Sequence, residues 1–242
     1  MHGLILAGGE GSRLLASGVA TPKALVPVGG VPQLLRLART LDQLRCESVT
    51  VLLREGVGLG ALAGDLARLS VPVELRSCRT PSSLHTLVQG LTVTPPGPVF
   101  CTMVETVMPM ADWLRLYRDA DRGLAGGADA VLAVTPFVDD ERPLFLAASR
   151  DGRVTAIGDA PTRPALVTGG VYALGSRARA AAWAALTVGH ERMRALLGAM
   201  VQRGYDLRAV EIAKIIDLDH RRDLDQANAW QESCEDGGAP VG

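Results

Sequence analysis

The chain has 242 residues, of which 48% are apolar and 21% are charged, and its formal net charge is −1. This length suits one sizeable α/β domain or two small ones. The balanced charge gives no support for a nucleic-acid or membrane-surface partner. No uninterrupted apolar stretch approaches the roughly 18 residues that a membrane span needs.

The cysteines point to a reducing compartment. Cys46, Cys78, Cys101 and Cys234 are far apart and form no CxxC pair or Cys/His cluster, so neither zinc nor a disulfide framework is indicated. The first residues lack the basic segment and long apolar segment of a secretory signal. These features lead us to expect a cytoplasmic protein.

Strand-like and helix-like patterns alternate through the first half of the chain. Short apolar or β-branched runs predict strands at 4–7, 49–53, 71–75, 99–103 and 130–134. Apolar residues at helical spacing predict helices at 32–44, 59–69, 81–91 and 111–120. This order predicts an α/β fold of three layers, in which helices cover both faces of a mostly parallel, twisted sheet.

The second half of the chain departs from this alternation. Segments 143–149 and 154–157 flank Asp151-Gly152, which predicts an inserted β-hairpin. Strands are then expected at 166–174, 207–210 and 214–216, and helices at 176–186, 191–202 and 221–230. No linker divides the chain, so we expect one domain over 1–232 and a polar, disordered tail over 233–242.

The segment between Gly3 and Gly30 carries the strongest chemical signal. A glycine-rich loop that follows a parallel strand can turn backbone N–H groups toward phosphate oxygens. Arg13 and Lys23 add two cations that bind phosphate well. The glycine spacing matches neither a Rossmann dinucleotide loop nor a P-loop. The segment therefore predicts a phosphate site of another type.

The same segment resembles the N-terminal signature of the sugar-nucleotide pyrophosphorylases, a family of NTP-transferases (nucleotidyltransferases), and the chain looks like a divergent member. The matching residues are Leu6-Ala7-Gly8-Gly9-Glu10-Gly11-Ser12-Arg13-Leu14 and, at the family's distance from Arg13, Pro22-Lys23 followed by Val26-Pro27-Val28-Gly29-Gly30-Val31-Pro32. The resemblance extends to about Trp230 and is most specific at the N-terminus. It implies the Rossmann-like fold of the nucleotide-diphospho-sugar transferases.

The resemblance also implies a reaction and a set of site residues. A sugar 1-phosphate, or another phosphomonoester, would attack the α-phosphorus of an NTP, and pyrophosphate would leave. Arg13 and Lys23 would act as the catalytic cations. The nucleotide would be bound by the loop residues Leu6, Ala7, Gly8, Gly9, Gly11 and Ser12, and by the segment that contains Ser82 and Ser83.

Family members hold Mg²⁺ with two carboxylates from distant parts of the chain. One follows a buried strand, where this sequence has Glu105 in place of the family's Asp. The other lies before the last helix, in 217–224, where Asp217 takes the metal position. The resemblance therefore implies Mg²⁺ as cofactor, with Glu105 and Asp217 as its ligands.

Three further positions concern the nucleobase and the acceptor. Ser82-Ser83-Leu84 replaces the Gly-Thr-Ala that begins the family's segment packed against the base. Ala160 stands where many members have a lysine that binds the sugar phosphate, and Arg163 is the candidate substitute. Gly170 and Tyr172 match the strand that lines the sugar side.

Three functional hypotheses follow. The first is Mg²⁺-dependent synthesis of an NDP-sugar from an NTP and a sugar 1-phosphate. The second is the same chemistry on a non-sugar phosphomonoester such as phosphocholine. The third is a degenerate, non-catalytic protein that binds a nucleotide or a sugar. The expected partners are an NTP and a phosphorylated small-molecule acceptor, with homo-oligomers allowed and with neither nucleic acid nor membrane.

Overall fold

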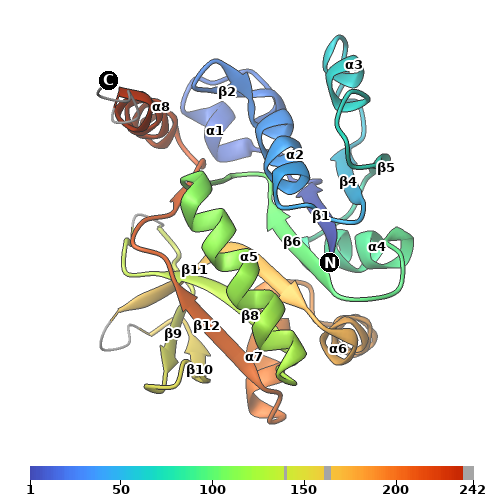
Figure 1. The fold of residues 1–242 in the computed structure, drawn as a ribbon, viewed down its shortest axis with the longest axis vertical. Helices are drawn as coiled ribbons and strands as arrows, with labels where there is room; N and C mark the ends of the chain where they lie inside the picture. The colour runs from blue at the N-terminus through green and yellow to red at the C-terminus, as the bar shows by residue number, and fades with distance from the viewer. Residues whose placement is uncertain (139–140, 161–164, 237–242) are drawn as a thin grey trace, which may run out of the picture.

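A computed structural model of the chain describes residues 1–138, 141–160 and 165–236. Its centre is a nine-stranded sheet with the order β10-β9-β11-β6-β1-β4-β5, in which β8 pairs with β11 and with β12 (Figure 1). The strands are β1 (His2–Ala7), β4 (Val49–Arg54), β5 (Val73–Cys78), β6 (Val99–Met103), β8 (Ala130–Thr135), β9 (Phe145–Ala148), β10 (Val154–Gly158), β11 (Leu166–Leu174) and β12 (Leu207–Glu211).

The sheet is mostly parallel. Strands β6, β1, β4 and β5 are parallel neighbours, and β12 is parallel to β8. The central β11 runs antiparallel to both β6 and β8, and β9 and β10 form the predicted antiparallel hairpin. The carboxyl ends of β1, β4 and β6 therefore lie at one edge, where ligands of open α/β sheets bind.

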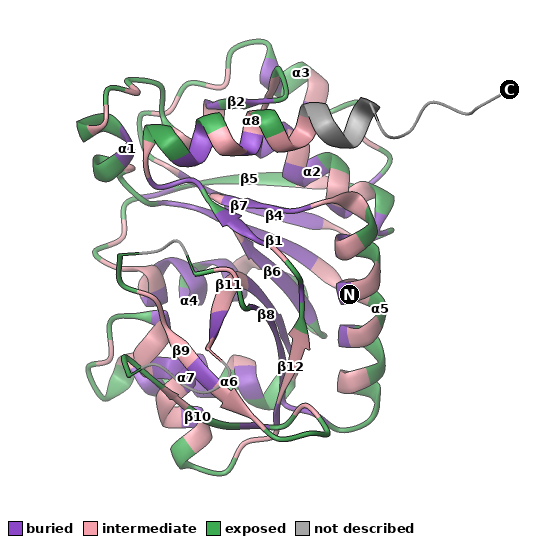
Figure 2. Cartoon of the chain, turned by 90° about the vertical axis from the view of Figure 1, so that its left-hand side faces the viewer, coloured by how far each residue is buried: buried purple, intermediate pink, exposed green. Residues whose placement is uncertain are grey.

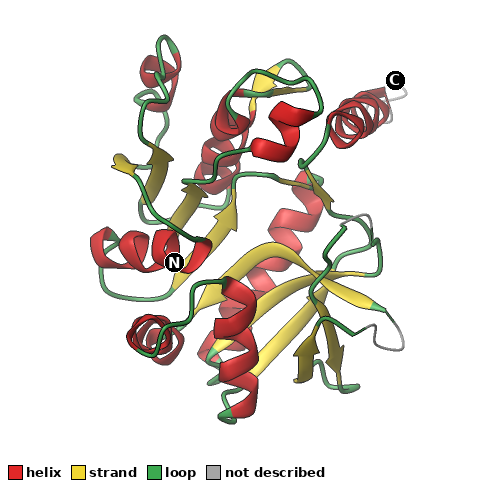
Figure 3. Cartoon of the chain, turned by 180° about the vertical axis from the view of Figure 1, so that it is seen from behind, coloured by secondary structure: helices red, strands yellow, loops and turns green. Residues whose placement is uncertain are grey.

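Helices cover both faces of this sheet (Figures 2 and 3). They are α1 (Ser12–Ala16), α2 (Gln33–Gln43), α3 (Leu62–Leu66), α4 (Ser83–Val93), α5 (Met110–Ala125), α6 (Ser176–Thr187), α7 (Met193–Gln202) and α8 (Arg221–Asp236). Along β1, Ile5 and Ala7 pack into a core with α2, α3 and α5, whereas Leu4 and Leu6 pack into a second core with α4, α6 and α7. This alternation confirms the three-layer α/β fold.

A third apolar cluster joins the two ends of the chain. Leu14 of α1 and Val28 pack against Leu218, Leu224 and Ala227 at and beside the start of α8. Two small sheets frame the cluster, one made of β2 (Pro27–Val28) and β3 (Val31–Pro32), the other of β7 (Thr106–Val107) and β13 (Ile216–Asp217). The cluster holds the N-terminal loop and the segment before α8 in one place.

Some predicted boundaries need correction. The helix expected at 59–69 is only Leu62–Leu66, because Gly60 before it has a positive φ of 51°, which an α-helix does not accommodate. The strand expected at 214–216 lies at Ile216–Asp217 instead, where it pairs with β7. Helix α8 continues to Asp236, past the start of the tail expected at 233.

Short elements of two or three residues escaped the sequence analysis, since they have no periodicity to detect. They are β2, β3, β7 and the 3₁₀ turn at Lys23–Leu25. Within the described residues, no helix combines the length and the apolar composition needed to cross a bilayer.

Candidate functional site

Two adjoining cavities lie at the carboxyl edge of the sheet. The first, of about 680 Å³, is lined by the loop that follows β1 and is called the loop cavity here. The second, of about 550 Å³, is lined by the segment leading into the β9–β10 hairpin and is called the hairpin cavity. Five residues line both: Arg13, Ser83, Met103, Glu105 and Asp219. The two cavities therefore form one continuous site with a shared boundary.

The glycine loop lines the loop cavity, together with Leu6, Ala7, Ser12 and Arg13. Gly8 packs closely against Cys78, since an added Cβ would lie 2.8 Å from Sγ of that residue. An added Cβ at Gly9 would meet nothing within 4 Å. Gly11 has a φ of 63°, which favours glycine. Gly8 is therefore required for close packing and Gly11 for a left-handed turn. Gly9 leaves space in front of the backbone.

Two cations and one carboxylate meet at the boundary between the cavities. Nζ of Lys23 lies 2.8 Å from Oδ1 of Asp219, and a guanidinium nitrogen of Arg13 lies 2.6 Å from Oδ2. Burial alone would lower the pKa of Lys23, but the charges of Glu105, Asp219 and Asp217 outweigh it and raise this pKa above its usual value. Lys23 is therefore a permanent cation.

The backbone around Asp219 explains its position. The N–H of Leu218 donates to the carbonyl of Glu105 over 3.1 Å, which joins the two carboxylate-bearing segments directly. The N–H of Asp219 donates to the carbonyl of Asp217 over 2.9 Å and to Oδ2 of Asp223 over 3.0 Å. Asp223 thereby caps the start of α8 and fixes the tight turn that aims Asp219 inward.

The predicted carboxylates are close together, and the structure adds a third. Glu105 lines both cavities, and Asp217 lines the hairpin cavity with an exposed side chain. Asp219, which the sequence analysis missed, is buried between them. Their oxygen atoms are the donors that Mg²⁺ prefers. In the described residues no three His, Cys, Asp or Glu side chains form a ready-made cage. The donor set still fits Mg²⁺, which usually takes one or two carboxylates plus substrate phosphates.

Ser82 and Ser83 lie at the start of α4, beside the glycine loop, and both line the loop cavity. Oγ of Ser82 hydrogen-bonds Nδ1 of His85 at 2.8 Å and also donates to the carbonyl of Glu191. Oγ of Ser83 accepts the N–H of Met193 at 3.3 Å. These bonds tie the start of α4 to the start of α7, so both cavities share this wall.

Gly170 and Tyr172 of β11, the predicted substrate-binding residues, line the hairpin cavity. Gly170 has a φ of 73°, and an added Cβ would lie 2.7 Å from Oγ1 of Thr106. Burial, together with the charges of Asp217 and Glu105, raises the pKa of Tyr172 above its usual value. Its phenol therefore remains protonated at neutral pH.

The hairpin cavity also contains cations that the sequence analysis did not identify. Arg142, Arg192 and Arg194 line it and are called the arginine wall here. Arg194 pairs with Asp159 at the end of the hairpin and donates to the carbonyl of Arg142 over 2.8 Å. Arg163, the predicted substitute for the missing lysine, lies outside the described residues.

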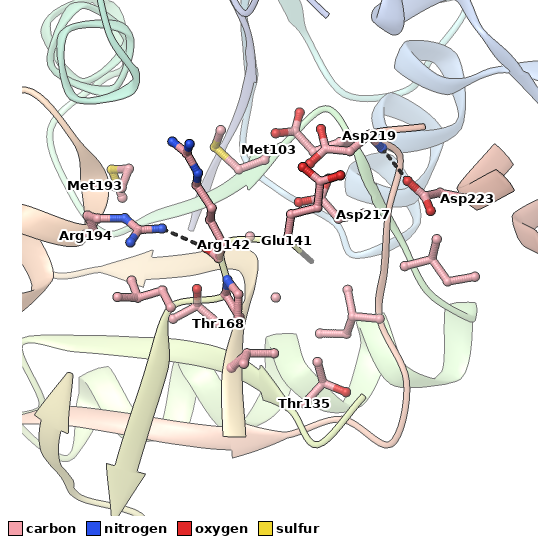
Figure 4. Close-up of a pocket in the computed structure, with 18 of the residues that line it drawn as sticks. Met103, Thr135, Glu141, Arg142, Thr168, Met193, Arg194, Asp217, Asp219 and Asp223 are labelled. Carbon is pink, nitrogen blue, oxygen red and sulfur yellow. Dashed lines mark hydrogen bonds between the residues drawn. The ribbon is translucent and has the colours of Figure 1, made fainter. Parts of the chain in front are cut away.

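The charges of the hairpin cavity are separated in space. Figure 4 shows the carboxylates of Glu141, Asp217 and Asp219 on one side, and the side chains of Arg142 and Arg194 on the other. Glu141 also faces His220, whose Nε2 lies 3.2 Å from Oε1. The cavity can therefore present acidic groups to a cation and guanidinium groups to an anion at the same time.

The fold and the site together define a nucleotidyltransferase-type enzyme. Residues 3–204 match the model of the MobA-like NTP transferase domain, and the chain belongs to this family. No curated protein sequence matches the chain.

Solved structures of similar shape carry related names. An inositol-1-phosphate CTP transferase from T. maritima has a TM-score of 0.77 at 15% identity, with 99% of this chain and 98% of that chain covered. A protein assigned as a glucose-1-phosphate thymidylyltransferase from Bacillus anthracis also has a TM-score of 0.77, at 18% identity, with 100% and 97% covered. A nucleoside-diphosphate-sugar pyrophosphorylase from Vibrio cholerae RC9 scores 0.74 at 14% identity, with 94% and 99% covered.

Proposed function

We propose that this enzyme transfers the nucleoside monophosphate of an NTP to a sugar 1-phosphate and releases pyrophosphate. The observation that carries the proposal is the meeting of Lys23, Arg13 and Asp219 at the boundary between the two cavities. A transfer between two bound substrates needs cationic groups at their junction, because negative charge accumulates there in the transition state. The loop cavity would take the NTP and the hairpin cavity the acceptor.

The loop residues would bind and orient the NTP. Open space in front of Gly9 and the turn at Gly11 would let the backbone approach the phosphates closely. Arg13 and Lys23 would neutralise charge around the α-phosphate. The raised pKa of Lys23 supports this role, since a lysine that stays protonated can act as a fixed positive charge.

Magnesium dependence is part of the proposal. Glu105, Asp217 and Asp219 are the residues that would hold Mg²⁺ together with substrate phosphates. When bound, the ion would neutralise phosphate charge and help to align the reacting groups. In this arrangement Lys23 and Arg13 also hold Asp219 in place before the substrates bind.

The arginine wall favours a sugar phosphate over phosphocholine as acceptor. A quaternary ammonium group binds best over open aromatic faces. Nζ of Lys214 already lies over two aromatic rings, 4.9 Å from the ring centroid of Phe137, which lines the hairpin cavity, and 4.8 Å from that of Trp230. A lysine therefore already occupies a face of each of these rings. The arginine wall would also repel a choline cation beside it, so that only the acidic side of the cavity could take such a group. The names of the structural neighbours, which act on phosphorylated sugars or inositol, support the same choice.

A cytoplasmic location belongs to the same proposal and is supported by the free, buried thiols of Cys46, Cys78 and Cys101. Burial raises the pKa of Cys46 to about 11, which keeps this thiol protonated and unreactive.

The test is a pyrophosphate-release assay with Mg²⁺, each of the four common NTPs, and a panel of sugar 1-phosphates with phosphocholine as comparison. We expect turnover with at least one sugar 1-phosphate and its loss in Lys23→Ala. Tight nucleotide binding without turnover on any acceptor would instead support a non-catalytic binding protein. Wild-type rates in Lys23→Ala would contradict the assigned site.

A further inference from the structure

We propose that the acceptor carries a second anionic group besides its phosphate, as a sugar acid 1-phosphate does, and that Arg192 of the arginine wall binds it. This inference rests on the proposed function, because it assigns the hairpin cavity to the acceptor. It names the chemical class of that acceptor from the charges that line the cavity.

The acceptor phosphate has to reach the NTP at the boundary between the cavities, beside Arg13 and Lys23. Figure 4 shows the Arg142 side chain directed toward Met103, one of the residues that line both cavities. Arg13, Lys23 and Arg142 therefore supply cations around the reacting phosphate. The acceptor phosphate does not need a further guanidinium.

The other two arginines of the wall are Arg194 and Arg192. Arg194 lies with Met193 across the hairpin cavity from Asp217 and Asp219 (Figure 4). Its guanidinium is held by the ion pair with Asp159 and by the carbonyl of Arg142. These two contacts position the guanidinium of Arg194 itself beside the cavity.

Arg192 is the third member of the wall and the one most available to a ligand. It precedes α7, and its carbonyl accepts the N–H groups of Ala195 and Leu196 at 3.0 and 3.2 Å. Its backbone is therefore fixed. Among the described residues its exposed guanidinium has no hydrogen-bond or ion-pair partner, although it lines the cavity. A carboxylate or second phosphate would match its forked geometry.

A neutral sugar in the hairpin cavity would leave the charge of Arg192 without a partner. Hydroxyl groups can bind Thr168 and the backbone at Gly169 and Gly170, which line the same cavity. A neutral acceptor would partly desolvate Arg192 without supplying an opposite charge, and this opposes binding. An anionic acceptor would compensate that cost.

Glucose 1-phosphate and glucuronic acid 1-phosphate make a matched pair of probes, because they differ only in a hydroxymethyl group and a carboxylate. With the preferred NTP and Mg²⁺, we expect kcat/KM to be at least about tenfold higher for the uronic acid, the size of effect of one charged hydrogen bond. In Arg192→Ala the ratio should fall to about one, and Arg192→Lys should retain part of it. Arg203→Ala, at the exposed opposite end of α7, is the control and should keep the wild-type ratio.

Binding of the two sugar phosphates by calorimetry, without nucleotide, gives a readout that does not need turnover. Tighter binding of the uronic acid 1-phosphate that is lost in Arg192→Ala supports the inference, even if no NTP is turned over. The absence of turnover would overturn only the proposed function. Equal or tighter binding of the neutral sugar phosphate overturns the inference. If the neutral sugar phosphate is also the better substrate, the inference fails and the proposed function still stands.

Discussion

Lys23 and Asp219 are 196 positions apart in the chain, yet Nζ of Lys23 donates a 2.8 Å hydrogen bond to Oδ1 of Asp219. Both side chains are largely shielded, with 11% and 9% of their surface exposed, so solvent screens the pair only weakly. The contact connects the glycine-rich loop to the segment before α8. One ion pair therefore joins the two ends of the fold at the place where the proposed reaction would occur.

The expected contribution of this ion pair to catalysis can be measured separately from its contribution to stability. We expect Lys23→Met to lower kcat/KM by about 10²–10³-fold, because a preorganised cation at the reacting phosphate is lost. We also expect it to destabilise the fold, because Asp219 keeps only Arg13 as a cationic partner. The loss of unfolding free energy in the double variant Lys23→Met/Asp219→Asn should be smaller than the sum of the losses in the two single variants, by about 0.5–3 kcal/mol. Urea unfolding measures the stabilities; simple additivity would argue against a coupled pair.

The raised pKa of Lys23 gives a pH dependence with a definite sign. The pKa in the folded state exceeds the value of about 10.4 in an unfolded chain. The charged lysine's contribution to stability is therefore complete below about pH 10.4 and is lost as the pH rises through the higher, folded pKa. The difference in unfolding free energy between wild type and Lys23→Met should stay constant from neutral pH to about pH 10 and shrink above it. A decline beginning near neutrality would contradict this.

Substitution of each carboxylate should change the Mg²⁺ concentration that the reaction needs. Glu105→Ala and Asp219→Ala should each raise the Mg²⁺ concentration for half-maximal activity by about tenfold or more, as loss of a ligand does. Glu105→Asp should retain activity if the backbone bond to Leu218 keeps the segment in place. Asp217→Ala should show a similar loss if Asp217 is a ligand. Wild-type Mg²⁺ dependence in Asp217→Ala would leave Glu105 and Asp219 as the pair.

The missed Asp219 shows what a sequence can and cannot predict about this site. The spacing of Arg13 and Lys23 predicted the loop, and the period of the apolar residues predicted the sheet and most helices, because both signals are local. Asp217 and Asp219 lie two residues apart, and sequence alone does not distinguish them. The turn between them depends on a local bond to Asp223 and on the pairing of Ile216–Asp217 with β7, and this pairing is a tertiary contact. The arginine wall was missed for the same reason, since it combines two distant segments.

Two neighbouring glycines should respond differently to the same substitution. Gly8→Ala places a Cβ 2.8 Å from Sγ of Cys78 and 3.0 Å from Cγ2 of Thr86, so we expect about 1–3 kcal/mol of destabilisation from overpacking. Gly9→Ala meets no atom within 4 Å, so its stability should stay within about 0.5 kcal/mol of wild type.

Gly9→Ala should instead affect nucleotide binding, because its methyl group would occupy space at the loop cavity through which the phosphates of the proposed NTP substrate would approach the backbone. We expect the KM for the NTP to rise by about tenfold, the equivalent of one charged hydrogen bond. Unchanged KM in a stable Gly9→Ala variant would place the phosphates elsewhere.

Arg179 of α6 provides a test of the fold that is independent of the site. Its guanidinium donates to the carbonyls that end α4 and begin the loop to β6, over 2.8 Å to Leu91, 3.1 Å to Thr94, 2.8 Å to Pro95 and 2.6 Å to Gly97. Desolvation lowers the pKa of Arg179, but arginine remains charged at any working pH.

Arg179→Met should therefore destabilise the fold by about 1–3 kcal/mol, because these carbonyls lose a charged donor. The exposed Arg118 of α5, for which no partner is found among the described residues, offers the matched control Arg118→Met. It should leave the unfolding free energy within about 0.5 kcal/mol of wild type. Pyrophosphate release per folded molecule should be the same in both variants, since neither residue lines the cavities. Equal stabilities would mean that water replaces Arg179 at the end of α4 without cost.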